Sequence, residues 1–129
     1  MFTGPNIVEE GLVLALDAAN TKSYPGSGTT WNDLSGNGNN GTLTNGPTFD
    51  SENQGSIDFD GTNDYIDAGA VSGDFSNFTV IAWFYPTSVT NNENVLDCNY
   101  SNYASTGNVG PRLEMNSSGK LSWIYSNVT

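Results

Sequence analysis

The sequence has no histidine, a single cysteine and only three basic residues among its 129 positions. Without histidine, the chain cannot build a Ser-His-Asp triad, a Cys-His pair or an HExxH zinc site. Cys98 cannot form an internal disulfide, and its place near the end of an expected strand predicts a small, buried apolar residue. The absence of histidine therefore excludes the nucleophilic and zinc chemistries that depend on an imidazole.

Positive charge is too scarce for a nucleic-acid partner. Lys22, Arg112 and Lys120 stand against 14 acidic residues, so the formal net charge is −11. A nucleic-acid-binding surface neutralises phosphates with lysine and arginine, which this chain cannot supply in number. The same charge disfavours anionic membrane surfaces. We therefore expect neither nucleic acid nor a membrane surface as a partner.

Long apolar runs are absent as well. No stretch approaches the ~18 apolar residues that cross a bilayer. The amino-terminal residues also lack the basic and apolar regions of a signal peptide. We expect no membrane insertion, and a role outside cells would depend on release by lysis, on assembly into a particle or on another route.

The residues that are present favour a β protein. Charged residues make up 13% of the chain and aromatic residues 12%, and there are 15 glycines. This composition, rich in Gly, Asn, Ser and Thr, favours short strands joined by polar turns over helices. The length favours a single domain over residues 1–129, with residues 1–10 as an amino-terminal arm. The predicted fold class is all-β, an antiparallel two-sheet sandwich.

The strongest strand pattern lies at residues 78–85. Apolar side chains alternate onto both faces there, which indicates a central strand covered on both sides. Pro86 is expected to end it. Trp83 would then belong to the core, and Trp83→Ala would cost the fold about 3–5 kcal/mol.

Other segments predict a set of shorter strands. Residues 12–16 favour a buried strand, with a helix over residues 8–19 as the alternative. A hairpin is expected from two strands, 56–59 and 65–68, that flank residues 60–64. Residues 20–47 are expected to form an ordered loop anchored by Trp31, Leu34 and Leu43, and further strands are predicted near 41–43, 95–98, 112–115 and 120–125.

Four segments in order suggest a family. They are GLVLALDA at 11–18, WNDLSGNGNNGT at 31–42, FDGTNDYI at 59–66 and FTVIAWF at 78–84. Over roughly residues 8–125 the chain resembles the laminin-G-like branch of the concanavalin A-like lectin/glucanase superfamily, in the form found in bacteriophage virion proteins. The resemblance implies an antiparallel jelly-roll sandwich that binds carbohydrates or surfaces and in some members carries calcium. Family members continue for several more strands, so we expect carboxy-terminal strands to come from a partner or from a longer protein.

The resemblance implies a non-enzymatic structural protein of a phage virion, on the capsid or associated with the tail or its fibres. The expected location is the virion surface, and the expected partners are other virion proteins, further copies of the chain and a host-surface glycan. Weak contacts repeated over many copies would hold a particle to a cell by avidity. The alternative is a calcium-dependent carbohydrate-binding module of a larger secreted or cell-surface protein, and a third reading is a glucanase-like enzyme.

Aromatic and amide side chains indicate a candidate glycan-binding site. Sugar rings stack on flat apolar faces, and Trp31, Trp123 and Tyr125 are candidates for such stacking, although core packing is the favoured role of each aromatic. The polar, aromatic loop that begins at residue 97 has the strongest binding character. Its candidate glycan-binding residues are Asn99, Tyr100, Asn102, Tyr103 and Asn108.

Acidic residues near position 60 indicate a candidate calcium site. Hard oxygens clustered in a turn suit calcium, and the candidate ligands are Asp60, Asn63 and Asp64. The competing interpretation is that these residues bond to the turn backbone. The nearest match to the glucanase pattern Glu-x-Asp-x-Glu is residues 56–60, where Ser56 occupies the first carboxylate position, so a retaining pair cannot form there.

Overall fold

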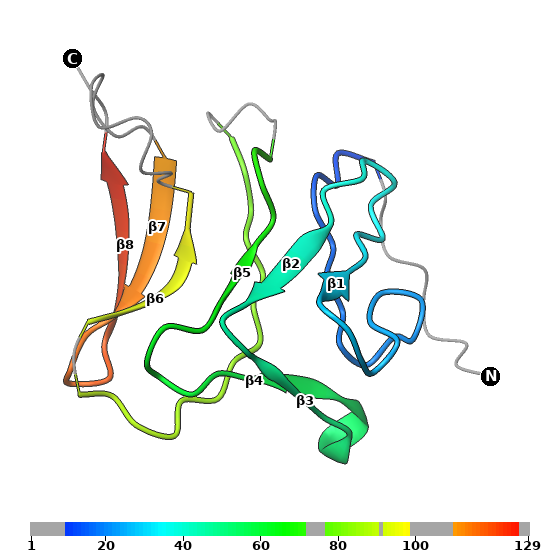
Figure 1. The fold of residues 1–129 in the computed structure, drawn as a ribbon. Helices are drawn as coiled ribbons and strands as arrows, with labels where there is room; N and C mark the ends of the chain where they lie inside the picture. The colour runs from blue at the N-terminus through cyan, green and yellow to red at the C-terminus, as the bar shows by residue number, and fades with distance from the viewer. Residues whose placement is uncertain (1–9, 72–76, 91, 99–109, 127–129) are drawn as a thin grey trace. The chain divides into compact units, whose positions relative to one another are not determined.

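The structure is a computed structural model of the chain, and it describes residues 10–71, 77–90, 92–98 and 110–126. Two compact units divide the chain, Met1–Gly73 and Asp74–Thr129, and each is described by itself. Every strand pair is antiparallel, and the described residues contain no α-helix (Figure 1). The all-β fold class is therefore confirmed. No helix in the described ranges is long and apolar enough to cross a membrane.

The first unit contains two small sheets. Strands β1 (Thr30–Trp31), β2 (Gly41–Thr44) and β5 (Tyr65–Asp67) form one sheet in the order β1-β2-β5. Strands β3 (Thr48–Asp50) and β4 (Ser56–Asp58) form the other and are joined through a short 3₁₀ helix, η1 (Glu52–Gln54). The predicted strand near 41–43 is confirmed as β2.

Aromatic rings form the core of the first unit. Tyr24 is buried, and its ring lies 6.2 Å from that of Trp31 and 5.4 Å from that of Phe49. The Tyr24 hydroxyl donates a hydrogen bond to the Gly28 carbonyl at 2.7 Å, which satisfies the polar end of the ring. Leu43 is buried in β2, while Trp31 and Leu34 are half-buried. The loop of residues 20–47 is thus ordered around the predicted anchors.

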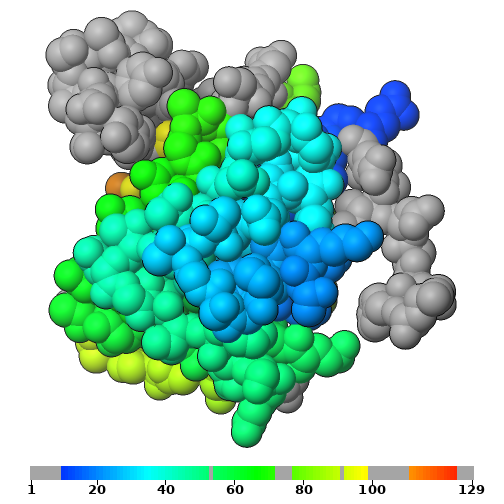
Figure 2. Space-filling view, turned by 45° about the vertical axis from the view of Figure 1, so that its right-hand side comes forward, coloured from blue at the N-terminus to red at the C-terminus, as the bar shows by residue number. Residues whose placement is uncertain are grey.

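Residues 12–16 do not form the predicted strand or its helical alternative. Their backbone bonds instead to the loop at residues 33–39, much of it through side chains. The Val13 carbonyl accepts from Ser35 Oγ at 3.1 Å and from Asn39 Nδ2 at 2.8 Å. Asn37 Nδ2 donates to the Leu12 carbonyl at 2.8 Å. Polar side chains therefore bond to backbone carbonyls that a neighbouring strand would otherwise pair. Residues 33–39 form part of the blue-to-cyan surface in Figure 2.

The predicted hairpin across residues 60–64 is wrong. Both strands exist, but β4 pairs with β3, and β5 pairs with β2. The turn between them carries the chain from one sheet to the other. Period-two patterning predicts which side chains share a face of a strand, but not which strand it pairs with.

The second unit contains a three-stranded sheet in the order β6-β7-β8. The strands are β6 (Glu93–Asp97), β7 (Gly110–Met115) and β8 (Leu121–Ser126). A turn at residues 116–120 joins β7 to β8, and Asn116 Oδ1 accepts from the backbone amides of Ser118 and Lys120, each at 3.0 Å. These three strands confirm the predictions for the carboxy-terminal third of the chain.

Residues 78–85 are not the central strand that the pattern predicts. They belong to no sheet, and Figure 1 shows them as a light green trace without an arrow. Trp83 is 96% exposed, so its assignment to the core is wrong. Phe78, at the start of the segment, lies against Trp123 of β8 with ring centroids 5.6 Å apart. The pattern identified an extended apolar segment correctly, but no described strand pairs with it.

Candidate functional site

A β-bulge shapes the polar face of the second unit. Strands β6 and β7 pair Asn94 with Glu114 and then Leu96 with Leu113, so the register shifts at Val95. Asn94 and Asp97 are three residues apart and would point to opposite faces of a regular strand. The extra residue at the bulge brings them to the same face, opposite Glu114 and Arg112 respectively.

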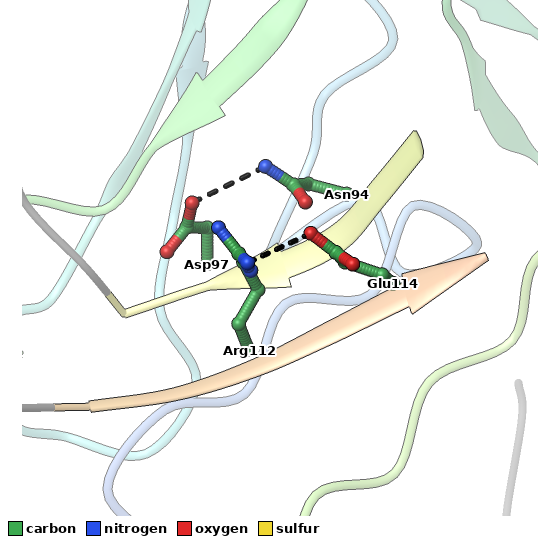
Figure 3. Close-up of polar contacts among 4 residues, drawn as sticks. All are labelled: Asn94, Asp97, Arg112 and Glu114. Carbon is green, nitrogen blue, oxygen red and sulfur yellow. Dashed lines mark hydrogen bonds and ion pairs between the residues drawn. The ribbon is translucent and has the colours of Figure 1, made fainter. Parts of the chain in front are cut away.

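Four polar side chains gather on this face (Figure 3). Arg112 Nη2 lies 2.9 Å from Glu114 Oε1, and Asn94 Nδ2 donates to Asp97 Oδ2 at 3.2 Å. Arg112 and Glu114 are two residues apart on β7, so both point away from the face that carries Leu113 and Trp123. We call this group of Asn94, Asp97, Arg112 and Glu114 the polar cluster.

Burial makes the polar cluster more than an ordinary surface ion pair. The side chains of Arg112 and Glu114 are 31% and 17% exposed. Arg112 Nε is buried and has no hydrogen-bond partner in the described part of the chain. A buried donor without a partner costs free energy, so this N–H would gain from a ligand or water acceptor once a shift of the Arg112 side chain makes it reachable.

The polar cluster can form hydrogen bonds of several kinds. A guanidinium offers up to five donors in a planar fork, carboxylates accept, and the Asn94 amide does both. Adjacent hydroxyls of a sugar are donors and acceptors at once, so they match such a mixed set. With one guanidinium and two carboxylates, the polar cluster carries a formal net charge of −1, which suits a neutral ligand better than an anionic one.

Cys98 follows the cluster at the end of β6. Its thiol is exposed, so the prediction of a buried apolar residue is wrong. Partial desolvation and the neighbouring Asp97 carboxylate raise the pKa of the Cys98 thiol. The thiol therefore stays protonated at neutral pH, which makes it a poor nucleophile.

The residues predicted to bind a glycan fall in three places. Trp31 packs against Tyr24 in the first unit, and Trp123 packs against Phe78 on the face opposite the polar cluster. Within the second unit, Trp123 therefore points away from the polar cluster. The other candidates lie in parts of the chain, or in side chains, outside those described: Asn99, Tyr100, Asn102, Tyr103, Asn108 and Tyr125.

The predicted calcium ligands lie together in the turn after β4. Asp64 Oδ2 accepts from the Asp60 backbone amide at 3.0 Å, and Asp60 Oδ1 accepts from the Thr62 amide at 2.8 Å. The Asn63 carbonyl accepts from Asn45 Nδ2 at 2.7 Å. These bonds give the residues a structural role in the turn.

One oxygen of this turn is not used. Asp64 Oδ1 is buried without a hydrogen-bond partner among the described residues. The described ranges hold no group of three or more His, Cys, Asp or Glu side chains that could bind a metal ion. Calcium takes about six to eight oxygens, so these residues alone would give a weak site completed by water and main-chain carbonyls.

Comparison with known proteins identifies the superfamily of the chain. A family model described as the concanavalin A-like lectin/glucanases superfamily, of the laminin-G type, matches residues 60–129. The chain belongs to this superfamily. The matched residues contain the whole polar cluster as well as the turn at Asp60 and Asp64. A comparison with curated protein sequences found no match.

One solved structure has a similar fold. The chain is similar to a crystal structure of an S-layer domain-containing protein from Clostridium thermocellum ATCC 27405, with a TM-score of 0.64 and 27% sequence identity. The similarity covers 79% of this chain and 46% of that chain. The present chain thus spans about half the length of that structure.

The polar cluster was not predicted from the sequence. Its four residues are spread over residues 94–114, and two of them share a face only because of the bulge at Val95. Arg112 offered the one usable signal, since it is one of three basic residues and alternates with Glu114 on a predicted strand.

Proposed function

We propose that this chain is a non-catalytic, surface-displayed module that binds glycans through the polar cluster of β6 and β7. The observation that carries the proposal is the bulge-aligned group around Arg112, whose buried Nε lacks a partner in the described residues. Membership of a superfamily of lectins and glucanases supports carbohydrate as the ligand. Mixed donors and acceptors with a small net charge favour neutral sugar hydroxyls.

The module is proposed to act in an assembled surface. The similar solved structure is named as an S-layer domain-containing protein, which supports a surface setting. Within that setting we propose the surface of a bacteriophage virion, on the basis of the laminin-G-like resemblance. Mass spectrometry of purified particles, followed by antibody labelling, would locate the protein there. Absence of the chain from purified particles would overturn the virion assignment and leave the glycan proposal untouched.

Catalysis is not part of the proposal. Ser56 replaces the first carboxylate of the glucanase pattern, and Asp60 Oδ1 accepts a hydrogen bond within its own turn. A retaining glycosidase needs two carboxyl groups about 5–5.5 Å apart across the bond that is cleaved. Turnover of laminarin or lichenan by the purified chain would contradict this part of the proposal.

A glycan array tests the binding proposal. We expect the wild type to bind a defined set of neutral glycans and Arg112→Ala to lose that binding. Lys120→Ala is the matched control, because it removes another cation from a turn outside the cluster. Thermal melts of both variants would establish that each remains folded. An array that shows equal binding by the wild type and Arg112→Ala would overturn the assignment of the site.

A calcium-dependent binding module is the second candidate, favoured by the buried and unpartnered Asp64 Oδ1. The proposal is that calcium at about 10⁻⁴–10⁻³ M raises the Tm of the wild type, as for weak extracellular sites. Asp64→Ala would reduce that rise, whereas Asp58→Ala on β4 would keep it. Equal melts of the wild type with calcium and with chelator would remove this candidate.

A further inference from the structure

The second unit exposes an extended segment at residues 79–85, which we call the exposed segment. It runs without a turn or bend up to Pro86 and makes no hydrogen bond with any described residue. Unpaired backbone donors and acceptors on an extended chain are a template for pairing with another strand. Pro86 has no N–H, so pairing would end there.

The large apolar side chains of the exposed segment are open to solvent. Because side chains alternate along an extended chain, one face carries Ile81, Trp83 and Tyr85. Their exposed fractions are 81%, 96% and 89%. The opposite face carries Val80 and Phe84, which are partly exposed. Trp83 and Tyr85 each offer roughly 150–250 Å² of contact surface. These side chains would supply part of the roughly 800 Å² per partner that stable complexes bury.

The sequence of the exposed segment is complementary to itself. Three β-branched residues, Thr79 to Ile81, precede Ala82, and three aromatic residues, Trp83 to Tyr85, follow it. In an antiparallel pair centred on Ala82, every β-branched residue therefore faces an aromatic one. Aromatic and β-branched side chains form favourable cross-strand pairs. The expected pairs are Ile81 with Trp83, Val80 with Phe84, and Thr79 with Tyr85.

We propose that two copies of this chain associate by antiparallel pairing of their exposed segments, with Ala82 opposite Ala82. Such an interface is isologous, because each copy presents the same surface to the other. Ala82 shares a face with Val80 and Phe84, so its small side chain leaves room for the two Phe84 rings that flank the central pair. The proposal rests on the geometry of the second unit and does not depend on glycan binding, although a dimer would double the valency of any glycan site.

Charge distribution permits this association. The second unit holds four acidic and two basic residues, a net −2, whereas the first holds ten acidic and one basic, a net −9. No charged residue occurs between Asp74 and Glu93. Repulsion between the highly acidic first units is screened beyond about 8 Å at physiological ionic strength. The exposed segment thus lies within the longest run of uncharged residues in the sequence.

Sedimentation velocity over a range of concentrations tests the proposal. The wild type is expected to form a dimer as its concentration rises, with a blue shift in tryptophan fluorescence as Trp83 becomes buried. Ala82→Asp places two carboxylates directly opposite each other and should weaken dimerisation at least tenfold. Ser88→Asp adds the same charge beyond Pro86 and should dimerise as the wild type does.

A mixing experiment tests the register itself. Ala82→Asp and Ala82→Lys copies should each stay monomeric alone and form a heterodimer when mixed, because opposite charges then meet at the centre. Recovery on mixing also shows that the variants are folded. A wild type that stays monomeric at about 1 mM would overturn the proposal. Dimerisation unaffected by Ala82→Asp, or hydrogen-exchange protection of residues 79–85 in a monomer, would overturn it as well.

Discussion

Asp33 accepts a hydrogen bond from the backbone amide of Ala15, eighteen residues earlier in the chain, at 2.9 Å. The same carboxylate accepts from the Ser35 amide, the Ser35 hydroxyl and the Asn39 amide. Its oxygens thus join residues 12–16 to the polar loop that replaces a neighbouring strand. Asp33 therefore connects two segments that lie far apart in the sequence.

Replacing Asp33 tests this role. Asp33→Ala removes the acceptor of four hydrogen bonds, several from backbone amides that have no other described partner. We expect the free energy of unfolding to fall by about 2–3 kcal/mol. Urea denaturation of the wild type and variant measures it. Asp58→Ala, which removes an exposed carboxylate from β4, should change stability by less than about 0.5 kcal/mol. Equal effects of the two changes would contradict the role of Asp33.

Stability should depend on pH through the same carboxyl group. Burial raises the pKa of Asp33, but the hydrogen bonds from Ser35, Ala15 and Asn39 outweigh burial and lower it below the ordinary value of 3.8. A lowered folded pKa contributes stability above the unfolded pKa, and that contribution is lost as pH falls through the folded value. The difference in unfolding free energy between the wild type and Asp33→Asn should therefore shrink below pH 3.8. A difference that stays constant down to strongly acidic pH would refute the linkage.

Gly55 occupies a position that other residues cannot share. Its φ is 121°, and a Cβ there would lie 2.8 Å from the Ala18 carbonyl oxygen and 3.0 Å from the Phe49 ring. Gly55→Ala should therefore destabilise the fold by about 2–4 kcal/mol through strain and overlap. Gly61 also has positive φ, but nothing lies near its Cβ position, so Gly61→Ala should cost only about 1 kcal/mol. Comparable melting temperatures for the two variants would contradict this account of Gly55.

The fold class followed from composition and from the alternation of apolar residues. Patterning located β2, β6, β7 and β8 because each carries a local signal of alternation and bounding turns. It failed at residues 12–16, where Asn and Ser side chains supply the hydrogen bonds of a missing strand. It also failed for the turn at 60–64, because strand partners depend on contacts distant in sequence.

The candidate site was harder to predict than the fold. Period-two reasoning places Asn94 and Asp97 on opposite faces, and a bulge at Val95 reverses that assignment. A bulge has no clear sequence signal, so the polar cluster emerges only from the register of β6 and β7. The acidic turn at Asp60 and Asp64 was predicted as a group, and the structure shows those carboxylates bonded to the turn backbone.

The two tryptophans of the second unit should respond differently to truncation. Trp83 is almost fully exposed, so Trp83→Ala should change the stability of the dilute protein by less than about 0.5 kcal/mol. Trp123 packs against Phe78, so Trp123→Ala should cost about 1–2 kcal/mol. Thermal melts at low protein concentration would measure both. A larger loss from Trp83→Ala would mean that this side chain is buried in solution.

The polar cluster of the second unit is proposed to bind neutral glycans. Isothermal titration calorimetry with the strongest glycan from an array tests it most directly. We expect Arg112→Ala to weaken the affinity at least tenfold and Lys120→Ala to leave it unchanged, with both variants melting as folded proteins. Binding that is the same in Arg112→Ala as in the wild type, or a wild type that binds no glycan, would contradict the claim.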